Sequence, residues 1–244
     1  MANLTRRGCF QGALAALAAP SKTMQGGMKL AEVFGSPQSR DVKLARQIGI
    51  THAIAGVGLG RVRREQYLET LQKLKNGFTE AGMTIAGVES HPVPADRITL
   101  GLEGRDEQIE NYKWAIEALS KVGVKMICYN FMAGLGWSRT RVDVPERGGA
   151  LTSEFDVEAA NKQGPTQWGE VSEEKMWDHL TYFVKAVMPV ADKFGVEMAL
   201  HPDDPPLSPL RGIGRIVTSA RNYRRIMDIV PSPINGVTFC QANF

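Results

Sequence analysis

The chain of 244 residues is poor in cysteine, in net charge and in long apolar runs. Its three cysteines, Cys9, Cys128 and Cys240, are too few and too scattered for a disulfide-based scaffold. No segment reaches the roughly 18 consecutive apolar residues that a transmembrane helix needs. The formal charge of +3 falls to +1 without Arg6 and Arg7, and the other basic residues alternate with acids, which argues against a nucleic-acid-binding surface.

The glycine-rich fingerprint of nucleotide-binding folds is also missing. The segment Gly56-Val57-Gly58-Leu59-Gly60 offers spaced glycines, but no acidic residue follows at the expected distance. What remains is a composition typical of a globular domain, with 43% hydrophobic and 23% charged residues. We therefore expect a folded protein that binds neither nucleotides through this loop nor nucleic acid.

The N-terminus has the pattern of an export signal. Arg6 and Arg7 precede a short apolar run from Gly12 to Pro20, and Ala16-Leu17-Ala18 offers a small-residue cleavage site. We expect residues 1–20 to be a twin-arginine-type signal peptide and residues 21–244 to be the catalytic domain. The protein would then be periplasmic or exported, without a membrane span after removal of the leader. The alternative is a frayed N-terminus on a cytoplasmic protein.

Beyond the leader, one strand–loop–helix pattern repeats. Helices end in glycine, which suits the left-handed backbone past a helix end, and an apolar residue opens the next strand. The predicted strands are Lys29–Phe34, Ile50–Val57, Met83–Glu89, Val124–Asn130, Val196–His201 and Gly236–Cys240. The clearest predicted helices are Asp106–Val122, Glu173–Phe194 and Ser219–Ile229.

This alternation predicts an α/β fold with a parallel sheet whose helices pack outside it. Six units can be counted, whereas a closed (β/α) barrel has eight strands. An open, doubly wound sheet can stop at six, so the count leaves both architectures open. A long loop, Ala133–Gly169, is inserted after the fourth strand.

Polar residues follow the strands at the edge where parallel α/β folds gather their chemistry. His201 and Cys240 end neighbouring predicted strands, and an imidazole and a thiolate are both ligands of first-row metals. Asp203 and Asp204 are either further ligands or groups that orient the His201 ring. The alternative is that His201 has a structural role only.

The inserted loop carries Trp137-Ser138-Arg139-Thr140-Arg141. An arginine presents a planar fork of donors that matches a carboxylate, so an acidic sugar is a suitable ligand. The alternative is an exposed, salt-bridging arginine. We expect His52 and His179 to be structural.

Five motifs, in order, resemble the mannonate dehydratase family. They are Val88-Glu89-Ser90-x-Pro92-Val93, Cys128-Tyr129-Asn130-Phe131-Met132, Gly136-Trp137-Ser138-Arg139-Thr140, His201-Pro202-Asp203-Asp204-Pro205-Pro206 and Gly236-Val237-Thr238-Phe239-Cys240. The resemblance runs from about Lys29 to the last residue. It implies a TIM barrel related to xylose-isomerase-like enzymes and dehydration of D-mannonate to 2-keto-3-deoxy-D-gluconate with Mn²⁺ or Fe²⁺.

The resemblance also implies roles for individual residues. His201 and Cys240 are the expected metal ligands, and Asn130, Trp137, Arg139 and Asp203 are the expected substrate-binding residues. A thiolate ligand is soft for Mn²⁺ and favours Fe²⁺ or Zn²⁺ on affinity grounds. The family's remaining ligands, a His and an Asp, and its other catalytic residues would follow Phe244, so we expect a C-terminally truncated barrel that is inactive and marginally stable.

Three departures from the family pattern leave the substrate less certain than the fold: Arg141 and Val142 stand before Asp143, Leu207 follows the prolines and Ala242 follows the cysteine. Two other functions stay open, a sugar isomerase or epimerase on the same barrel and a non-catalytic sugar-acid-binding paralogue. The expected partner is a small-molecule sugar acid, and a homo-oligomer is compatible with the sequence.

Overall fold

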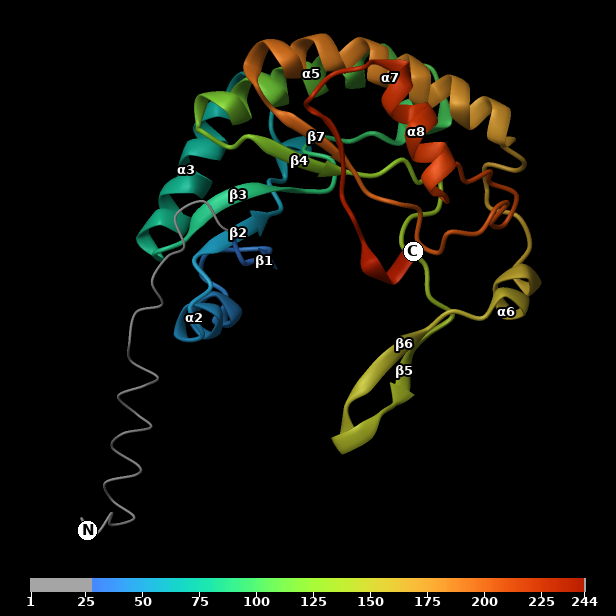
Figure 1. Cartoon of the computed structure of the whole chain (residues 1–244), viewed down its shortest axis with the longest axis horizontal. Helices are drawn as coiled ribbons and strands as arrows, with labels where there is room; N and C mark the ends of the chain where they lie inside the picture. Colours follow the sequence, from blue (N-terminus) through green and yellow to red (C-terminus); the bar gives the residue numbers. More distant parts are fainter. Residues whose placement is uncertain (1–27, 244) are drawn as a thin grey trace, which may run out of the picture.

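The computed structural model describes residues 28–243, which form a curved sheet with helices on its outer side (Figure 1). The signal peptide predicted over residues 1–20 lies outside the described residues. Within the described part, no helix is both long and apolar enough to cross a bilayer.

Six strands build one parallel sheet in the order β1-β2-β3-β4-β7-β8. Within this sheet, the strands lie side by side in the order in which the chain forms them. A doubly wound sheet reverses its strand order at a switch point, and this sheet does not, so the order selects the barrel type of fold. The strands are β1 Ala31–Phe34, β2 His52–Ala55, β3 Thr84–Glu89, β4 Met126–Tyr129, β7 Glu197–Leu200 and β8 Asn235–Val237.

The six predicted strands are confirmed, with ends that differ by a few residues. The largest difference is at β8, which ends at Val237 instead of Cys240. Thr238 still donates its backbone N–H to the Leu200 carbonyl, but Cys240 lies beyond the paired part of the strand. The described barrel thus has six strands, two fewer than a closed barrel of eight.

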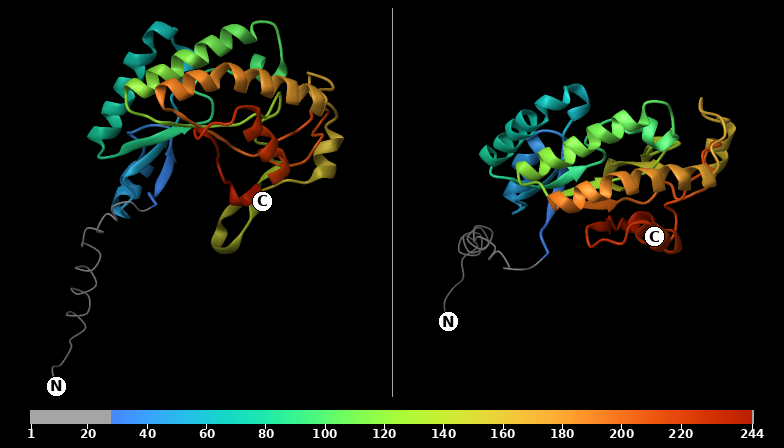
Figure 2. Two further views of the ribbon diagram at one scale, coloured as in Figure 1. Left: turned by 45° about the horizontal axis from the view of Figure 1, so that its top comes forward. Right: turned by 90° about the horizontal axis from the view of Figure 1, so that it is seen from above.

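The helices cover the convex side of the sheet (Figures 1 and 2). The α-helices of this layer are α2 Arg40–Gln47, α3 Tyr67–Glu80, α4 Asp96–Leu100, α5 Arg105–Lys121, α7 Glu173–Phe194 and α8 Ala220–Ile229. Short 3-10 helices elsewhere in the described residues are Leu59–Arg61, Arg64–Gln66, Arg147–Gly149 and Gln241–Asn243. Helix α7 has the predicted bounds. It begins after Ser172, whose side chain accepts the Lys175 N–H, and ends at Gly195, whose φ of 60° is left-handed.

The core lies between the sheet and helices α5 and α7. Tyr112 of α5 and Phe183 of α7 are fully buried, with ring centroids 5.0 Å apart and an edge-on arrangement. Tyr129 at the end of β4 packs against the same Phe183 ring at 5.8 Å. Aromatic rings favour such tilted contacts, and burying side chains of this size supplies most of the stabilisation available to the fold. The core thereby fixes the end of β4, next to which the candidate site lies.

The inserted segment is more ordered than the loop that the sequence predicts. It contains a two-stranded antiparallel hairpin, β5 Arg141–Pro145 and β6 Leu151–Glu154, and a short helix, α6 Val157–Lys162. Gly148 and Gly149, at φ of 73° and 81°, allow the chain to reverse between the strands. The hairpin projects away from the rest of the protein (Figure 1). Its strands are exposed on both faces, so they lack the alternation of apolar and polar residues by which a strand is recognised in a sequence.

Candidate active site

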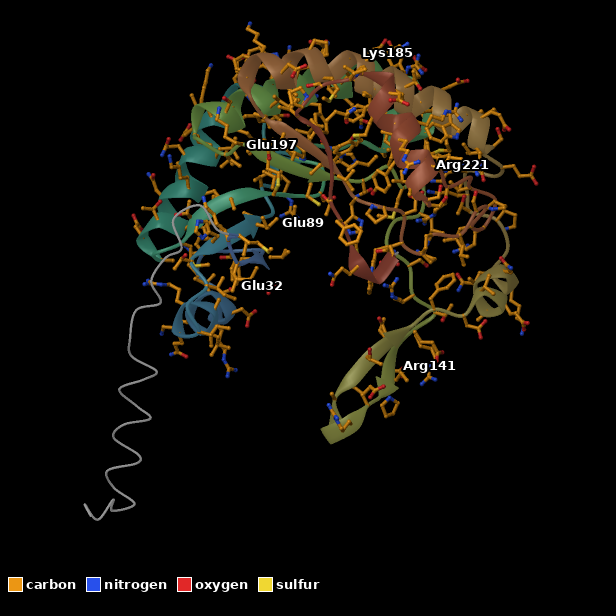
Figure 3. The ribbon with its side chains drawn as sticks, viewed as in Figure 1. Glu32, Glu89, Arg141, Lys185, Glu197 and Arg221 are labelled. Carbon is orange, nitrogen blue, oxygen red and sulfur yellow. The ribbon has the colours of Figure 1, made fainter. Side chains whose placement is uncertain are left out.

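A cavity of about 790 Å³ lies at the carboxyl ends of β3, β4, β7 and β8. Because parallel strands end at one edge of the sheet, the residues that follow them converge there. The lining residues are Glu89, Ser90, His91, Cys128, Asn130, Met132, Gly136, Trp137, Arg139, His201, Asp204, Cys240 and Ala242. Figure 3 shows Glu89 at the end of β3 on the inner side of the arc, whereas Lys185 and Arg221 lie on the outer helices.

The structure brings five of the six predicted site residues to this one cavity: Asn130, Trp137, Arg139, His201 and Cys240. They come from segments as far apart as residues 130 and 240, and only the sheet brings them together. The sixth, Asp203, is not among the lining residues, whereas its neighbour Asp204 is. The substrate-binding role of Asp203 stays a prediction.

The geometry of His201 suits a metal ligand. Its backbone N–H donates to the Tyr129 carbonyl at 2.6 Å, which fixes the residue one position past β7. Its ring Nδ1 lies 2.7 Å from the Pro202 carbonyl oxygen. A carbonyl only accepts, so Nδ1 is the donor here, and in the neutral ring the lone pair is then on Nε2. A histidine that binds a metal through Nε2 needs this tautomer.

Cys240 supplies a partly exposed thiol to the same cavity. The two residues thus have the donor chemistry of a first-row metal site. Among residues 28–243, however, no group of three or more His, Cys, Asp or Glu side chains is placed to hold a metal together. His201 and Cys240 therefore fit part of a metal site, because structural and catalytic sites in proteins need three or four protein donors.

The second thiol, Cys128, is buried at the end of β4. The hydroxyl of Thr238 lies 3.1 Å from its Sγ and equally far from the Ala199 carbonyl oxygen, so it bridges β4, β7 and β8. Burial raises the pKa of the Cys128 thiol. Although Cys128 lines the cavity, a buried thiol that keeps its proton is less available to a metal than the more exposed thiol of Cys240.

Arg139 already has a carboxylate partner within the chain. Its Nη1 donates to Asp204 Oδ1 at 2.7 Å and its Nη2 to Asp204 Oδ2 at 3.1 Å. The guanidinium also stacks over the Trp137 ring, 4.2 Å from the centroid. The sequence predicts that the arginine guanidinium binds a carboxylate, and in this structure that carboxylate belongs to Asp204.

Asp203 is turned away from the cavity into the protein. It is 1% exposed, and its Oδ2 accepts the Val217 N–H at 2.8 Å. Its Oδ1 lies 4.0 Å from Nη1 of the buried Arg215. Burial raises the pKa of Asp203 to about 6, and the opposing charge of Arg215 only moderates this effect. Asp203 thus holds the segment before α8.

Glu89, at the end of the predicted strand Met83–Glu89, is a cavity residue that is not among the predicted site residues. Its carboxyl lines the cavity, and burial raises its pKa while the nearby His201 ring lowers it. An acidic residue at the carboxyl end of a predicted parallel strand was the signal available in the sequence. The structure adds that Glu89 shares a cavity with the candidate metal ligands.

His91 occupies the unspecified position of the Val88–Val93 motif. Its ring lies against Tyr112 and Tyr129, with centroids 5.8 and 6.2 Å away. Neither ring nitrogen makes a well-formed hydrogen bond within the described residues, although the Asn130 backbone is close enough to influence the ring. Burial lowers the pKa of His91 to about 4, so the ring is neutral at pH 7.

Comparison with known proteins identifies the family. Residues 34–168 and 162–244 match the D-mannonate dehydratase (UxuA) family. The chain is 38% identical to mannonate dehydratase 2 of Halalkalibacterium halodurans and 35% identical to mannonate dehydratase of Streptococcus uberis, in each case over 86% of this chain and 67% of the relative.

Solved structures give the same result. Mannonate dehydratase from Streptococcus suis serotype 2 superposes with a TM-score of 0.77 and 30% identity, covering 87% of this chain and 64% of that one. D-psicose 3-epimerase from Clostridium cellulolyticum H10, at 14% identity and a TM-score of 0.51, shares the fold alone. The chain spans about two thirds of the length of these mannonate dehydratases. On the strength of the matched residues, the chain belongs to the D-mannonate dehydratase family.

Proposed function

We propose that the chain forms the greater part of a metal-dependent hydro-lyase that converts D-mannonate to 2-keto-3-deoxy-D-gluconate. The observation that carries the proposal is the convergence of His201, Cys240 and the Arg139–Asp204 pair on one cavity, in a chain of this family. An imidazole and a thiol supply metal donors, and the charged pair supplies polar contacts for a sugar acid.

The reaction needs removal of the weakly acidic C2 proton and loss of the 3-hydroxyl as water. A bound divalent metal would supply a Lewis acid for the charge that develops on the substrate carboxylate. Glu89 lines the cavity and is a carboxyl group able to donate or accept a proton there. His201, with Nδ1 bound to the Pro202 carbonyl, presents Nε2 in a fixed orientation.

We assign Mn²⁺ or Fe²⁺ to the site, with His201 and Cys240 as two of its ligands. The thiolate of Cys240 makes Fe²⁺ the better match on affinity, because sulfur is a soft donor and Mn²⁺ binds most weakly in the first-row series. Two donors from this part of the chain would hold a metal weakly.

The substrate side of the cavity is held in place by its own hydrogen bonds. The Asn130 amide donates to the Ser90 hydroxyl at 3.3 Å, and its carbonyl oxygen accepts the Met132 N–H at 3.3 Å. Trp137 is 60% exposed and offers a flat ring to a sugar. We propose Asn130, Trp137 and Arg139 as substrate-binding residues and keep Asp203 as an indirect contributor through its contact with Arg215.

Metal binding is tested on the 244-residue chain with Co²⁺, whose thiolate complex has an intense charge-transfer absorption. We expect this absorption from the wild type and from the control Cys128→Ser, and its loss in Cys240→Ser. His201→Ala should weaken Co²⁺ binding by at least about ten-fold. Equal Co²⁺ affinity in the wild type, Cys240→Ser and His201→Ala would remove the proposed ligands.

Turnover is tested by incubating D-mannonate and other aldonates with Mn²⁺ or Fe²⁺. We expect no product from the 244-residue form and 2-keto-3-deoxy-D-gluconate from a form as long as the relatives. Bound metal without turnover of any aldonate in the longer form contradicts the proposal. Interconversion of keto-sugars without loss of water instead identifies an isomerase or epimerase, and sugar-acid binding that survives His201→Ala and a chelator identifies a non-catalytic binding protein.

We also propose that residues 1–20 direct export, on the basis of the paired Arg6 and Arg7 before the apolar run. N-terminal sequencing of the protein from a bacterial periplasm checks this. A mature N-terminus near residue 20 supports export, whereas an intact N-terminus in the cytoplasm contradicts it.

A further inference from the structure

Arg215 is the one cation that is buried among the described residues, with 2% of its surface exposed. It lies in the segment that connects β7 to α8. Its nearest carboxylate oxygen, Asp203 Oδ1, is 4.0 Å away, at the limit for an ion pair. A buried guanidinium loses its hydration, and a single ion pair of this length does not offset that loss. The reason for burying Arg215 must lie in its other contacts.

The guanidinium bridges two loops through backbone carbonyls. Its Nη2 donates to the Leu135 carbonyl at 2.6 Å and to the Gly136 carbonyl at 3.2 Å. Its Nη1 donates to the Asp204 carbonyl at 3.3 Å. The first loop follows β4 and the second follows β7, so one side chain joins two segments that are otherwise about 70 residues apart in sequence.

Both loops supply side chains to the cavity. Trp137 and Arg139 follow the carbonyls of the first loop, and His201 and Asp204 belong to the second. Among these four residues, Arg139 and Asp204 are the pair joined by side-chain hydrogen bonds. That bidentate geometry requires a fixed separation of the two loops, and Arg215 hydrogen-bonds to the backbone of both.

Arg215 is itself rigidly placed. Its backbone N–H donates to the Ser208 hydroxyl at 2.9 Å. Two residues later, Val217 exchanges backbone and side-chain hydrogen bonds with Asp203, through Val217 N to Asp203 Oδ2 at 2.8 Å and Asp203 N to Val217 O at 2.9 Å. The Arg215 guanidinium therefore extends from a fixed segment, which is required of a group that holds other loops in place.

We infer that Arg215 is a positioning residue for the substrate side of the cavity. It sets the separation between the loop of Trp137 and Arg139 and the loop of Asp204, and so preforms the wall that contacts the sugar acid. The metal side should be affected less, because the His201 backbone is held by the Tyr129 carbonyl, Cys240 follows β8, and neither residue hydrogen-bonds to Arg215. The effect on sugar-acid binding rests on the proposed function, whereas the effect on loop order does not.

The test compares Arg215→Lys with the wild type. A lysine keeps the charge beside Asp203, but its three donors share one nitrogen and cannot replace the separate Nη1 and Nη2 contacts to the two loops. Arg215→Met combined with Asp203→Asn is a second variant that leaves no unpaired buried charge. The matched control is Arg225→Lys, an arginine of α8 that stacks on Trp177, 3.8 Å from the ring centroid, and does not line the cavity.

Hydrogen–deuterium exchange of the whole chain gives a readout that requires no activity. In Arg215→Lys we expect exchange in residues 133–141 to accelerate by about ten-fold while β4 and α7 keep their wild-type rates. The control should leave residues 133–141 unchanged. Unchanged exchange in that segment, or an equal acceleration in α7, overturns the inference, because the first shows no support of the loop and the second shows general destabilisation.

The second readout is binding by calorimetry. In Arg215→Lys, we expect the affinity for D-mannonate to fall by about ten-fold and the affinity for Co²⁺ to change by less than about two-fold, since a displacement of the order of 1 Å costs such factors. An equal loss of both affinities overturns the positioning role. If the wild type binds no aldonate, the proposed function fails in this form, and the exchange experiment still decides the inference about Arg215.

Discussion

Arg139 and Asp204, 65 residues apart in the chain, meet in a bidentate ion pair with N–O distances of 2.7 and 3.1 Å. The pair joins the loop after β4 to the loop after β7, and both side chains are largely shielded from solvent, at 18% and 13% exposure. A sugar-acid carboxylate that binds the Arg139 guanidinium must therefore share it with Asp204. The pair makes this side of the cavity a neutral, ordered surface instead of an open cationic one.

The strength of this pair can be measured by a double-mutant cycle. We expect Asp204→Ala and Arg139→Ala each to lower the free energy of unfolding by about 2 kcal/mol, because charge-assisted hydrogen bonds with good geometry are lost. The double variant should lose less than the sum, with a coupling of about 1 kcal/mol, as measured by urea denaturation. Strictly additive losses would mean that the pair contributes no interaction energy.

His91 makes stability depend on pH in a specific way. Burial lowers its pKa to about 4 from an ordinary value of 6.5. Between these values the unfolded chain holds a proton that the folded chain lacks, so stability falls as the pH drops from about 6.5 towards 4 and is level below 4. The expected decrease in the free energy of unfolding due to His91 is up to about 3 kcal/mol.

Replacement by an apolar residue of similar size isolates this contribution. We expect His91→Leu to be more stable than the wild type by about 1 kcal/mol at pH 7, because it removes ring nitrogens that lack a well-formed hydrogen bond. The difference between the two proteins should widen as the pH falls to 4, in denaturation curves measured at each pH. A constant difference across that range contradicts burial of a neutral ring.

The two described thiols should react differently. In a Cys9→Ser background, Cys240 is partly exposed and Cys128 is buried with its pKa raised, so a disulfide reagent should modify Cys240 first. We expect Cys240 to react at least about 100 times faster than Cys128, as measured by mass spectrometry of the labelled peptides. Co²⁺ should protect Cys240 and leave Cys128 unaffected. Modification of Cys128 first would mean that the end of β4 is open to solvent.

The β5–β6 hairpin should be dispensable for folding. Its strands pair with each other, and nearly all of their residues are exposed. A two-stranded hairpin is marginally stable alone, so its contribution to the fold is small. Replacement of residues 142–153 by two glycines should change the melting temperature by less than about 3 °C in calorimetry. A larger loss would show that the hairpin supports the body of the protein.

The repeating part of the fold was readable in the sequence. Local patterns determine the six strands and the bounds of α7, because apolar periodicity, the Ser172 cap and the Gly195 end each depend only on residues a few positions away. The same reasoning placed His201, Asn130 and Cys240 near strand ends. The hairpin was missed because strands exposed on both faces lack the apolar alternation on which such predictions rely.

Sequence alone determined the repeating units, the family motifs and the types of residue available for chemistry. Tertiary structure decided the sequential strand order that selects a barrel, the inward turn of Asp203, the partnership of Arg139 with Asp204 and the support that we infer from Arg215. The physical reason is distance along the chain. Helix and strand signals act between residues a few positions apart, whereas these contacts join residues 14 to 80 positions apart, and only packing of the sheet and its loops brings them together.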